Sequence, residues 1–186
     1  MTLPNTLAKP GQISIIALAL TMMSATNAAA QDSSAAQKPA HALAWMLGEW
    51  EGSGWQMDRT GTRNSFDVYE RADAIVGGHA VTFTGRGYAP RGGGDPGALV
   101  HDAFGLITHT PTGYQMRAVT FAGHQQDVDM TITEHGFEWA LQLGPDTRIV
   151  YTARLDGEEW LEEGAYCPAN GPCRQTFEMR LTRVGD

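Results

Sequence analysis

Alternation of apolar and polar residues with a period of two runs through most of this 186-residue chain, and it constrains the fold more than any other feature. Val128, Met130 and Ile132, for example, are separated by polar residues, which gives that segment one apolar and one polar face. Such alternation is typical of β-strands with one buried side. The pattern predicts ten strands, at residues 48–57, 66–72, 79–88, 99–108, 113–122, 127–132, 137–143, 148–155, 158–166 and 174–183.

Short turn signals separate the predicted strands, among them Gly77-Gly78 and Asp156-Gly157. Connections this short leave no room for crossover helices, so neighbouring strands are expected to pair antiparallel in an up-and-down order. A flat sheet of ten strands would leave two open edges, and closure removes them. We therefore predict an all-β fold: a ten-stranded antiparallel up-and-down β-barrel, with a short N-terminal helix at 41–47 capping the base and a flexible loop at 89–97 by one mouth.

The first thirty residues follow a different pattern. Lys9 precedes an apolar run at 15–25, and the small residues of 28–30 come before Gln31. A membrane anchor needs about 20 apolar residues, so this shorter run indicates a cleaved signal peptide. The predicted organisation is a signal peptide at 1–30, a disordered leader at 31–40 and a single barrel domain at 41–186, in a periplasmic or secreted protein with no membrane insertion after processing.

The chain carries a formal charge of −8, and removal of Lys9 with the signal peptide would make it −9, because residues 1–30 contain no acidic side chain. Nucleic acids and anionic membranes are bound through basic surfaces. We therefore expect no nucleic-acid partner. We also expect the protein to be a monomer or a homodimer.

Two cysteines, Cys167 and Cys173, flank a turn-rich segment at 168–172. In an oxidising compartment such a pair is typical of a local disulfide that closes a hairpin. The alternatives are a redox dithiol, which usually has two intervening residues instead of five, and one half of a zinc site. We predict the disulfide.

The segment Gly48-Glu49-Trp50-Glu51-Gly52-Ser53-Gly54 lies just after the predicted helix and opens the first predicted strand. A Gly-x-Trp at this place resembles the start of calycin-superfamily barrels, and the longer Gly-x-Trp-x-Gly-x-Gly form resembles lipocalin-like and nitrobindin-like bacterial families of unknown function. The resemblance implies that Trp50 closes the base of the barrel, with Gly48 and Gly52 as structural residues. It also implies that a basic residue of the last strand, Arg180 or Arg183, lies across Trp50.

The resemblance fails at the cofactor site. Nitrobindin-like barrels hold haem through a histidine late in the chain, whereas this sequence has no histidine after His135. None of the six histidines has the His-Glu-x-x-His spacing of a zinc hydrolase. We accordingly predict no cofactor and no metal. Haem binding would require His124 or His135 to replace the missing ligand from a different strand.

A ten-stranded barrel is generally too wide for side chains alone to fill, so a cavity is expected. The aromatic residues and methionine of the predicted inner face and a few polar groups would line it. The predicted ligand-binding residues are Phe83, Phe104, His101, Met116, Arg117, Trp139, Tyr151 and Trp160, and Phe66 is also placed on the inner face.

A pair of carboxylates in the lumen could do acid and base work, but most are assigned to the polar faces: Asp127 and Asp129 lie opposite an apolar face, and the acidic run at 158–163 is interpreted as the rim of a hairpin. Glu70 is the one interruption in the alternation of its strand. No nucleophile elbow or phosphate-binding loop is present. The first functional hypothesis is therefore binding of a small hydrophobic or amphipathic molecule. The alternatives are a cofactor-independent isomerase, cyclase or lyase acting in the lumen, and a ligand-free envelope interaction protein with a filled barrel.

Overall fold

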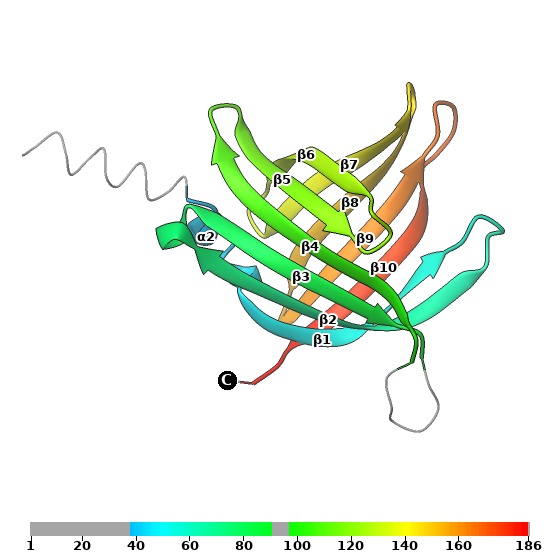
Figure 1. Ribbon diagram of the computed structural model, residues 1–186. Coiled ribbons are helices and arrows are strands. Elements are labelled where there is room, and N and C mark those ends of the chain that lie inside the picture. Colours follow the sequence, from blue (N-terminus) through cyan, green and yellow to red (C-terminus); the bar gives the residue numbers. More distant parts are fainter. Residues whose placement is uncertain (1–37, 91–96, 186) are drawn as a thin grey trace, which may run out of the picture.

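The computed structural model describes residues 38–90 and 97–185, and these residues form a closed barrel of ten antiparallel strands (Figure 1). Each strand pairs with its neighbours in the sequence, and β1 pairs with β10 to close the ring. The predicted all-β, up-and-down barrel is confirmed. The strands are β1 Gly48–Met57, β2 Arg63–Ile75, β3 Ala80–Tyr88, β4 Leu99–Thr110, β5 Gly113–Thr120, β6 Gln125–Ile132, β7 Gly136–Gly144, β8 Thr147–Asp156, β9 Glu159–Cys167 and β10 Arg174–Arg183.

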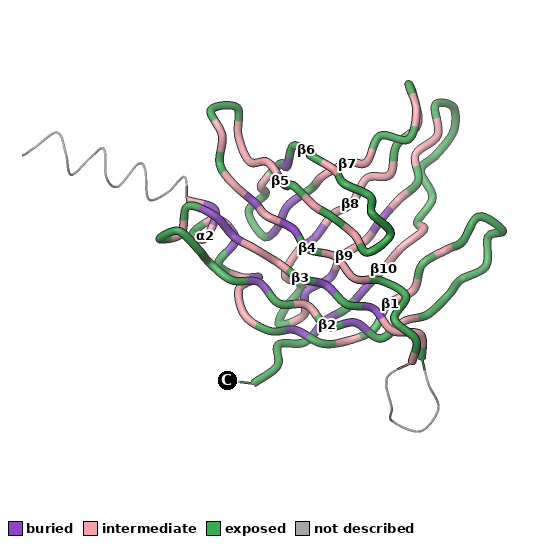
Figure 2. The backbone as a smooth tube through the Cα atoms, viewed as in Figure 1, coloured by how far each residue is buried: buried purple, intermediate pink, exposed green. Residues whose placement is uncertain are grey.

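The strands follow the alternation seen in the sequence (Figure 2). Val68 and Ala72 on β2, for example, are buried in the interior while Asp67 and Arg71 are exposed. Most boundaries agree with the prediction to within about two residues, because the turn residues between the runs fix where pairing can continue. The largest difference is β2, which extends beyond the predicted 66–72 at both ends.

A short helical segment closes one end of the barrel. Helix α2 (Pro39–Ala42) is followed by a 3₁₀ turn, η1 (Ala44–Met46), and Leu43 and Met46 are buried against the core. Proline suits the first turn of a helix, and Pro39 occupies that position. The helix therefore starts two residues before the predicted 41–47, inside the predicted leader.

The predicted signal peptide and residues 31–37 of the predicted leader lie outside the described residues. Within 38–90 and 97–185, no helix is long and apolar enough to cross a membrane.

The end opposite α2 is here called the mouth; it carries the β1–β2, β3–β4, β5–β6, β7–β8 and β9–β10 turns (Figure 1). The backbone N–H of Ala89 donates to the carbonyl of Ala98 at 2.8 Å, so the described ends of the predicted 89–97 loop lie at the mouth. Residues 91–96 of that loop are outside the described residues. A second 3₁₀ turn, η2 (Val76–Gly78), connects β2 to β3 at the closed end.

Pairing between β6 and β7 is the shortest around the described barrel. Three pairs join them, Met130 with Trp139, Thr131 with Glu138 and Ile132 with Phe137, whereas six or more join every other adjacent pair of strands. All three pairs lie close to the β6–β7 turn at the closed end. Toward the mouth, residues 125–129 and 140–144 are not paired with each other; this region is called the β6–β7 seam below.

A disulfide joins Cys167, the last residue of β9, to Cys173, which precedes β10, as predicted. The bridge closes a loop at the mouth end of the β9–β10 hairpin. Disulfides are typical of proteins in oxidising compartments outside the cytoplasm.

Replacing both cysteines by serine is expected to lower the free energy of unfolding by about 2 kcal/mol, because a loop this small loses little chain entropy when it is closed. Urea unfolding of the oxidised protein and of the double variant measures the difference. Reduced wild-type protein should match the double variant, and a loss above about 4 kcal/mol would show that the bridge does more than restrict the unfolded chain.

Candidate functional site

The lumen contains a cavity of about 740 Å³. It extends from Met46, near the closed end, to Gln56, Asn64 and Pro90 at the mouth. Small inward residues such as Gly85, Ala103 and Ala118 leave this space open. The barrel is thus wide enough to hold a small molecule, as its strand number led us to expect.

Most of the predicted lining residues border this cavity. They come from β2, β3, β4, β5, β7, β8 and β9, and are Phe66, Phe83, His101, Met116, Trp139, Tyr151 and Trp160. Burial lowers the pKa of His101, against the opposing effect of Asp102, so its imidazole is neutral at physiological pH. His124 also borders the cavity, whereas His135 is exposed in the β6–β7 turn.

Two predicted lining residues are outside the barrel, and these assignments were wrong. Phe104 lies between the inward Ala103 and Gly105 on β4, so its ring points outward and is 44% exposed. Arg117 follows the inward Met116 and donates two hydrogen bonds to Asp127, at 2.6 and 2.8 Å. Successive side chains of a strand point to opposite faces of the sheet, and residue type alone does not show which face a side chain occupies.

The base of the barrel is built around Trp50, which is 2% exposed. Its indole N–H donates to the carbonyl of Met46 at 2.8 Å, and its ring meets that of Trp160 edge to face. The guanidinium of Arg183 lies 4.2 Å from the centre of the Trp50 ring and donates to the carbonyls of Leu47 and Trp45. Arg183 is therefore the residue that covers Trp50.

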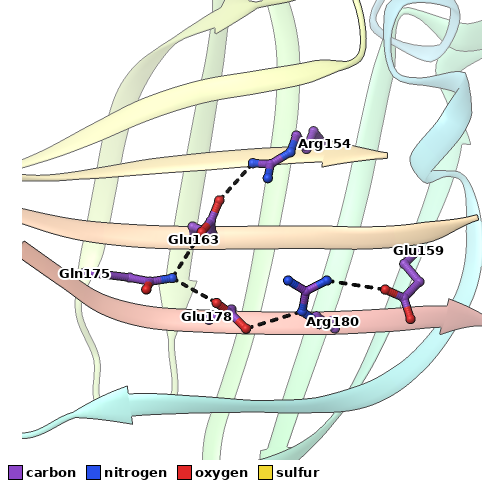
Figure 3. Close-up of polar contacts among 6 residues, drawn as sticks. All are labelled: Arg154, Glu159, Glu163, Gln175, Glu178 and Arg180. Atoms are coloured by element: carbon purple, nitrogen blue, oxygen red, sulfur yellow. Dashed lines mark hydrogen bonds and ion pairs between the residues drawn. The ribbon is translucent and has the colours of Figure 1, made fainter. Parts of the chain in front are cut away.

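Arg180, the other candidate, lies on the outer surface. Figure 3 shows it in a chain of polar contacts across β8, β9 and β10, where it donates to Glu178 at 3.3 Å and to Glu159 at 3.5 Å. Glu163 continues this chain by accepting from Arg154 at 2.8 Å. Met179 and Leu181 are buried in the core on either side of Arg180, so alternation places Arg180 outside.

Steric contacts explain why glycine is needed at the two predicted structural positions. Gly48 has a φ of +113°, and a Cβ there would lie 2.6 Å from the guanidinium of Arg183. A Cβ on Gly52 would lie 2.0 Å from the backbone oxygen of Arg180. The Gly-x-Trp-x-Gly pattern thus allows β10 and its arginine to approach the start of β1.

Two carboxyl groups that were not among the predicted lining residues line the cavity: Glu70 on β2 and Glu162 on β9. The carboxyl of Glu70 lies over Gly85 of the neighbouring strand, where a Cβ would come within 2.3 Å of it. No basic side chain of the described residues forms an ion pair with either carboxyl. Two acidic groups therefore face the lumen without a cationic partner among the described residues.

Enclosure in this lumen disfavours the charged form of each group. Burial raises the pKa of Glu162 to about 7, although the nearby indole of Trp160 favours the carboxylate. Burial and then the charge of Glu162 raise the pKa of Glu70 well above its usual range, and the same two causes raise the pKa of Tyr151 to about 12. Glu70 and Tyr151 thus stay protonated near neutral pH, while Glu162 titrates in that range.

The indole N–H of Trp160 lies close enough to Glu162 to affect its pKa, yet it is buried without an acceptor in hydrogen-bonding geometry. The deep part of the cavity therefore has one indole donor and two carboxyl groups with unused hydrogen-bonding capacity. Among the described residues, no three His, Cys, Asp or Glu side chains are grouped closely enough to hold a metal ion.

A sequence signal for both carboxyls was available. Glu70 shares the parity of Phe66, Val68 and Ala72, so the interruption in the alternation marked an inward acid. Glu162 has the parity of Trp160, but the neighbouring acids made the whole run look external. Glu162 is two residues from Trp160 and therefore on the same face of β9, whereas Glu163 is on the opposite face.

No protein-family model matches the chain, and no curated protein matches it in sequence. Its fold is similar to that of solved structures. The crystal structure of Rv2717c from M. tuberculosis matches with a TM-score of 0.58 and 17% identity, over 79% of this chain and 98% of that one. The S-type phycobiliprotein lyase CPES from Guillardia theta matches with a TM-score of 0.49 and 5% identity, over 77% of this chain and 90% of that one. At these identities the likeness concerns the fold alone, which is a closed ten-stranded antiparallel barrel.

Proposed function

We propose that this protein binds a small, largely apolar molecule inside its barrel. The observation that carries this proposal is the cavity of about 740 Å³, which lies within the range of known small-molecule sites. Its walls are mainly aromatic and aliphatic, and a few polar groups border it. The disulfide supports the further proposal that the protein works in an exported, oxidising setting such as the periplasm.

A second candidate function is acid–base catalysis on a molecule held in the same lumen. Glu70, Glu162 and Tyr151 favour it, because perturbed ionisable groups that share a cavity are typical of active sites. In an isomerase or lyase, the carboxylate of Glu162 would accept a proton and the neutral Glu70 would supply one. The filled-barrel alternative lacks support, since it requires a lumen without a cavity.

Filling the lumen tests the binding proposal. Ala118→Phe places a ring in the cavity from the middle of β5, and Val119→Phe adds bulk to the next residue, which points outward. Binding of the uncharged fluorophore N-phenyl-1-naphthylamine, followed by its emission, should be at least about tenfold weaker in Ala118→Phe, because about 1.4 kcal/mol of lost contact corresponds to that factor.

The Val119→Phe control should bind the fluorophore as wild type does. Equal affinity in all three proteins would place the fluorophore outside the lumen and contradict the proposal. Circular dichroism of both variants establishes that the barrel is intact.

A further inference from the structure

We propose that the luminal site selects a molecule carrying a protonated amine on an apolar body, with the ammonium group held between Glu70 and Glu162. This inference rests on the proposed function and specifies its ligand class. It depends on which charges face the lumen, on where the protein's own cations are placed, and on the rings that surround the carboxyls.

The charged and titratable groups around the cavity divide by depth. Arg63, His101 and His124 belong to the turns and strand ends at the mouth. Tyr151, Glu70 and Glu162 come from the strand interiors, and the charge of Glu162 is felt by the other two. The interior of the lumen therefore offers negative charge and hydroxyl groups, without a positive group among the described residues.

The cations near the closed end are directed elsewhere. Arg154 and Arg180 lie on the outer surface in contact with Glu163 and Glu178 (Figure 3). Arg71, next to Glu70 in the chain, is also outside and pairs with Glu49. These side chains are held in external ion pairs, and Arg63 lies at the mouth, so the described residues place no positive charge beside the two carboxyls and a cationic ligand would supply it.

Aromatic rings surround the same space. Trp139 and Tyr151 stack with their centres 4.2 Å apart, and Phe177 meets Tyr151 edge to face at 5.9 Å. Phe66 stacks on Phe177 at 6.0 Å. Ring faces attract cations, and this attraction is stronger where water is excluded. Rings and carboxyls together suit an organic cation better than a strongly hydrated inorganic one.

Other ligand charges fit the site less well. A carboxylate or phosphate would place a negative charge beside the charge of Glu162, where the low dielectric of the lumen strengthens repulsion. A neutral alcohol could accept from Glu70 and donate to Glu162, but it would leave the charge of Glu162 unpaired. An ammonium pairs that charge and donates hydrogen bonds of the charge-assisted kind.

Binding of the amine is expected to release protons. In the empty site the two carboxyls hold protons near neutral pH because burial disfavours their charged forms. An adjacent ammonium favours the ionised carboxylates, so the protons leave as the cation enters. Affinity should therefore rise between pH 6 and pH 8, a range in which an alkylamine with a pKa of ~10.4 stays protonated.

Calorimetric titration at pH 7 with decylamine, decanol and decanoate, each below its aggregation limit, tests the inference with one chain length and three charges. Decylamine is expected to bind at least about tenfold more tightly than decanol, and decanoate most weakly, because a hydrogen bond to a charged group is worth more than a neutral one. Repeating the decylamine titration in two buffers with different ionisation enthalpies should show net proton release.

Glu162→Gln should weaken decylamine binding about tenfold and leave decanol within about twofold of wild type. The matched control is Glu163→Gln, one residue along β9 on the outer face, which should leave both affinities unchanged. Retained decanol binding in Glu162→Gln also shows that the lumen is intact.

The outcomes separate the two proposals. If decanol binds as tightly as decylamine, or decanoate binds best, the amine inference is wrong and luminal binding stands. If none of the three binds, the amine inference is wrong, and the binding of N-phenyl-1-naphthylamine to wild type and Ala118→Phe decides the proposal of luminal binding. An equal loss of decylamine affinity in Glu162→Gln and Glu163→Gln would assign the effect to net charge and overturn the luminal ion pair.

Discussion

Trp50→Ala should lower the free energy of unfolding by about 3–5 kcal/mol, the range for removing a large aromatic ring from a core. The ring is 2% exposed, and its loss also removes the hydrogen bond to Met46 and the surface on which Arg183 rests. The closed end would then lose the contact that joins η1, β1 and β10. Urea unfolding followed by circular dichroism measures the difference.

Trp55→Ala is the matched control, because Trp55 lies on the same strand with the opposite parity. Its main partner is Arg63, whose guanidinium lies 3.7 Å from the ring centre. Trp55 is only half-buried, and a cation–π contact near the surface is worth about 0.5–1 kcal/mol, so the control should lose clearly less than Trp50→Ala. Similar losses in the two variants would contradict the role of Trp50 as the closure of the base.

Glu162→Gln should make the stability of the ligand-free protein less dependent on pH between about 4.5 and about 7. The pKa of this carboxyl rises from 4.5 to about 7 on folding. The folded state therefore binds its proton more tightly than the unfolded state, and this stability is lost as pH rises from about 4.5 to about 7. The difference corresponds to about 3 kcal/mol in total, of which about 2–3 kcal/mol falls between pH 5 and pH 8.

The measurement is urea unfolding of wild type and Glu162→Gln at pH 5 and pH 8. The wild type should lose about 2–3 kcal/mol more than the variant between the two pH values, and any packing effect of the amide cancels in this comparison. Glu163→Gln, whose carboxyl is outside and paired with Arg154, should behave as wild type does. A constant difference between wild type and Glu162→Gln would mean that the carboxyl titrates normally.

Much of the fold was predictable because alternation and turn chemistry act locally. The ten strands, the closure of the barrel and the disulfide between Cys167 and Cys173 all follow from patterns within short segments. The choice of Arg183 over Arg180 was not local. Arg183 is positioned by its pairing with Trp50 across β1 and β10, a register that no single segment specifies.

The site was less predictable, because neighbouring residues of a strand point to opposite sides of the barrel wall. Glu162 and Glu163 are chemically alike and adjacent, yet one faces the cavity and the other pairs with Arg154 outside. Phe104 looked like a lining residue because of its ring, but its ring lies on the exterior opposite Val119. To predict which residues face the lumen, the inward position of one residue such as Trp50 has to be extended by strict alternation to every strand. Bulges shift the alternation by one residue, for example between Gly87 and Tyr88.

The β6–β7 seam gives the barrel a preferred place to open. Most of the wall can separate only by breaking many cooperative hydrogen bonds, whereas here the three pairs near the closed end hold the two strands together. Local opening uses the segments with the fewest bonds to break. Trp139 and Leu141 of β7 border both the cavity and this seam. Opening of the wall at this seam would break fewer strand pairs than opening elsewhere in the described barrel, and it would leave the base around Trp50 closed.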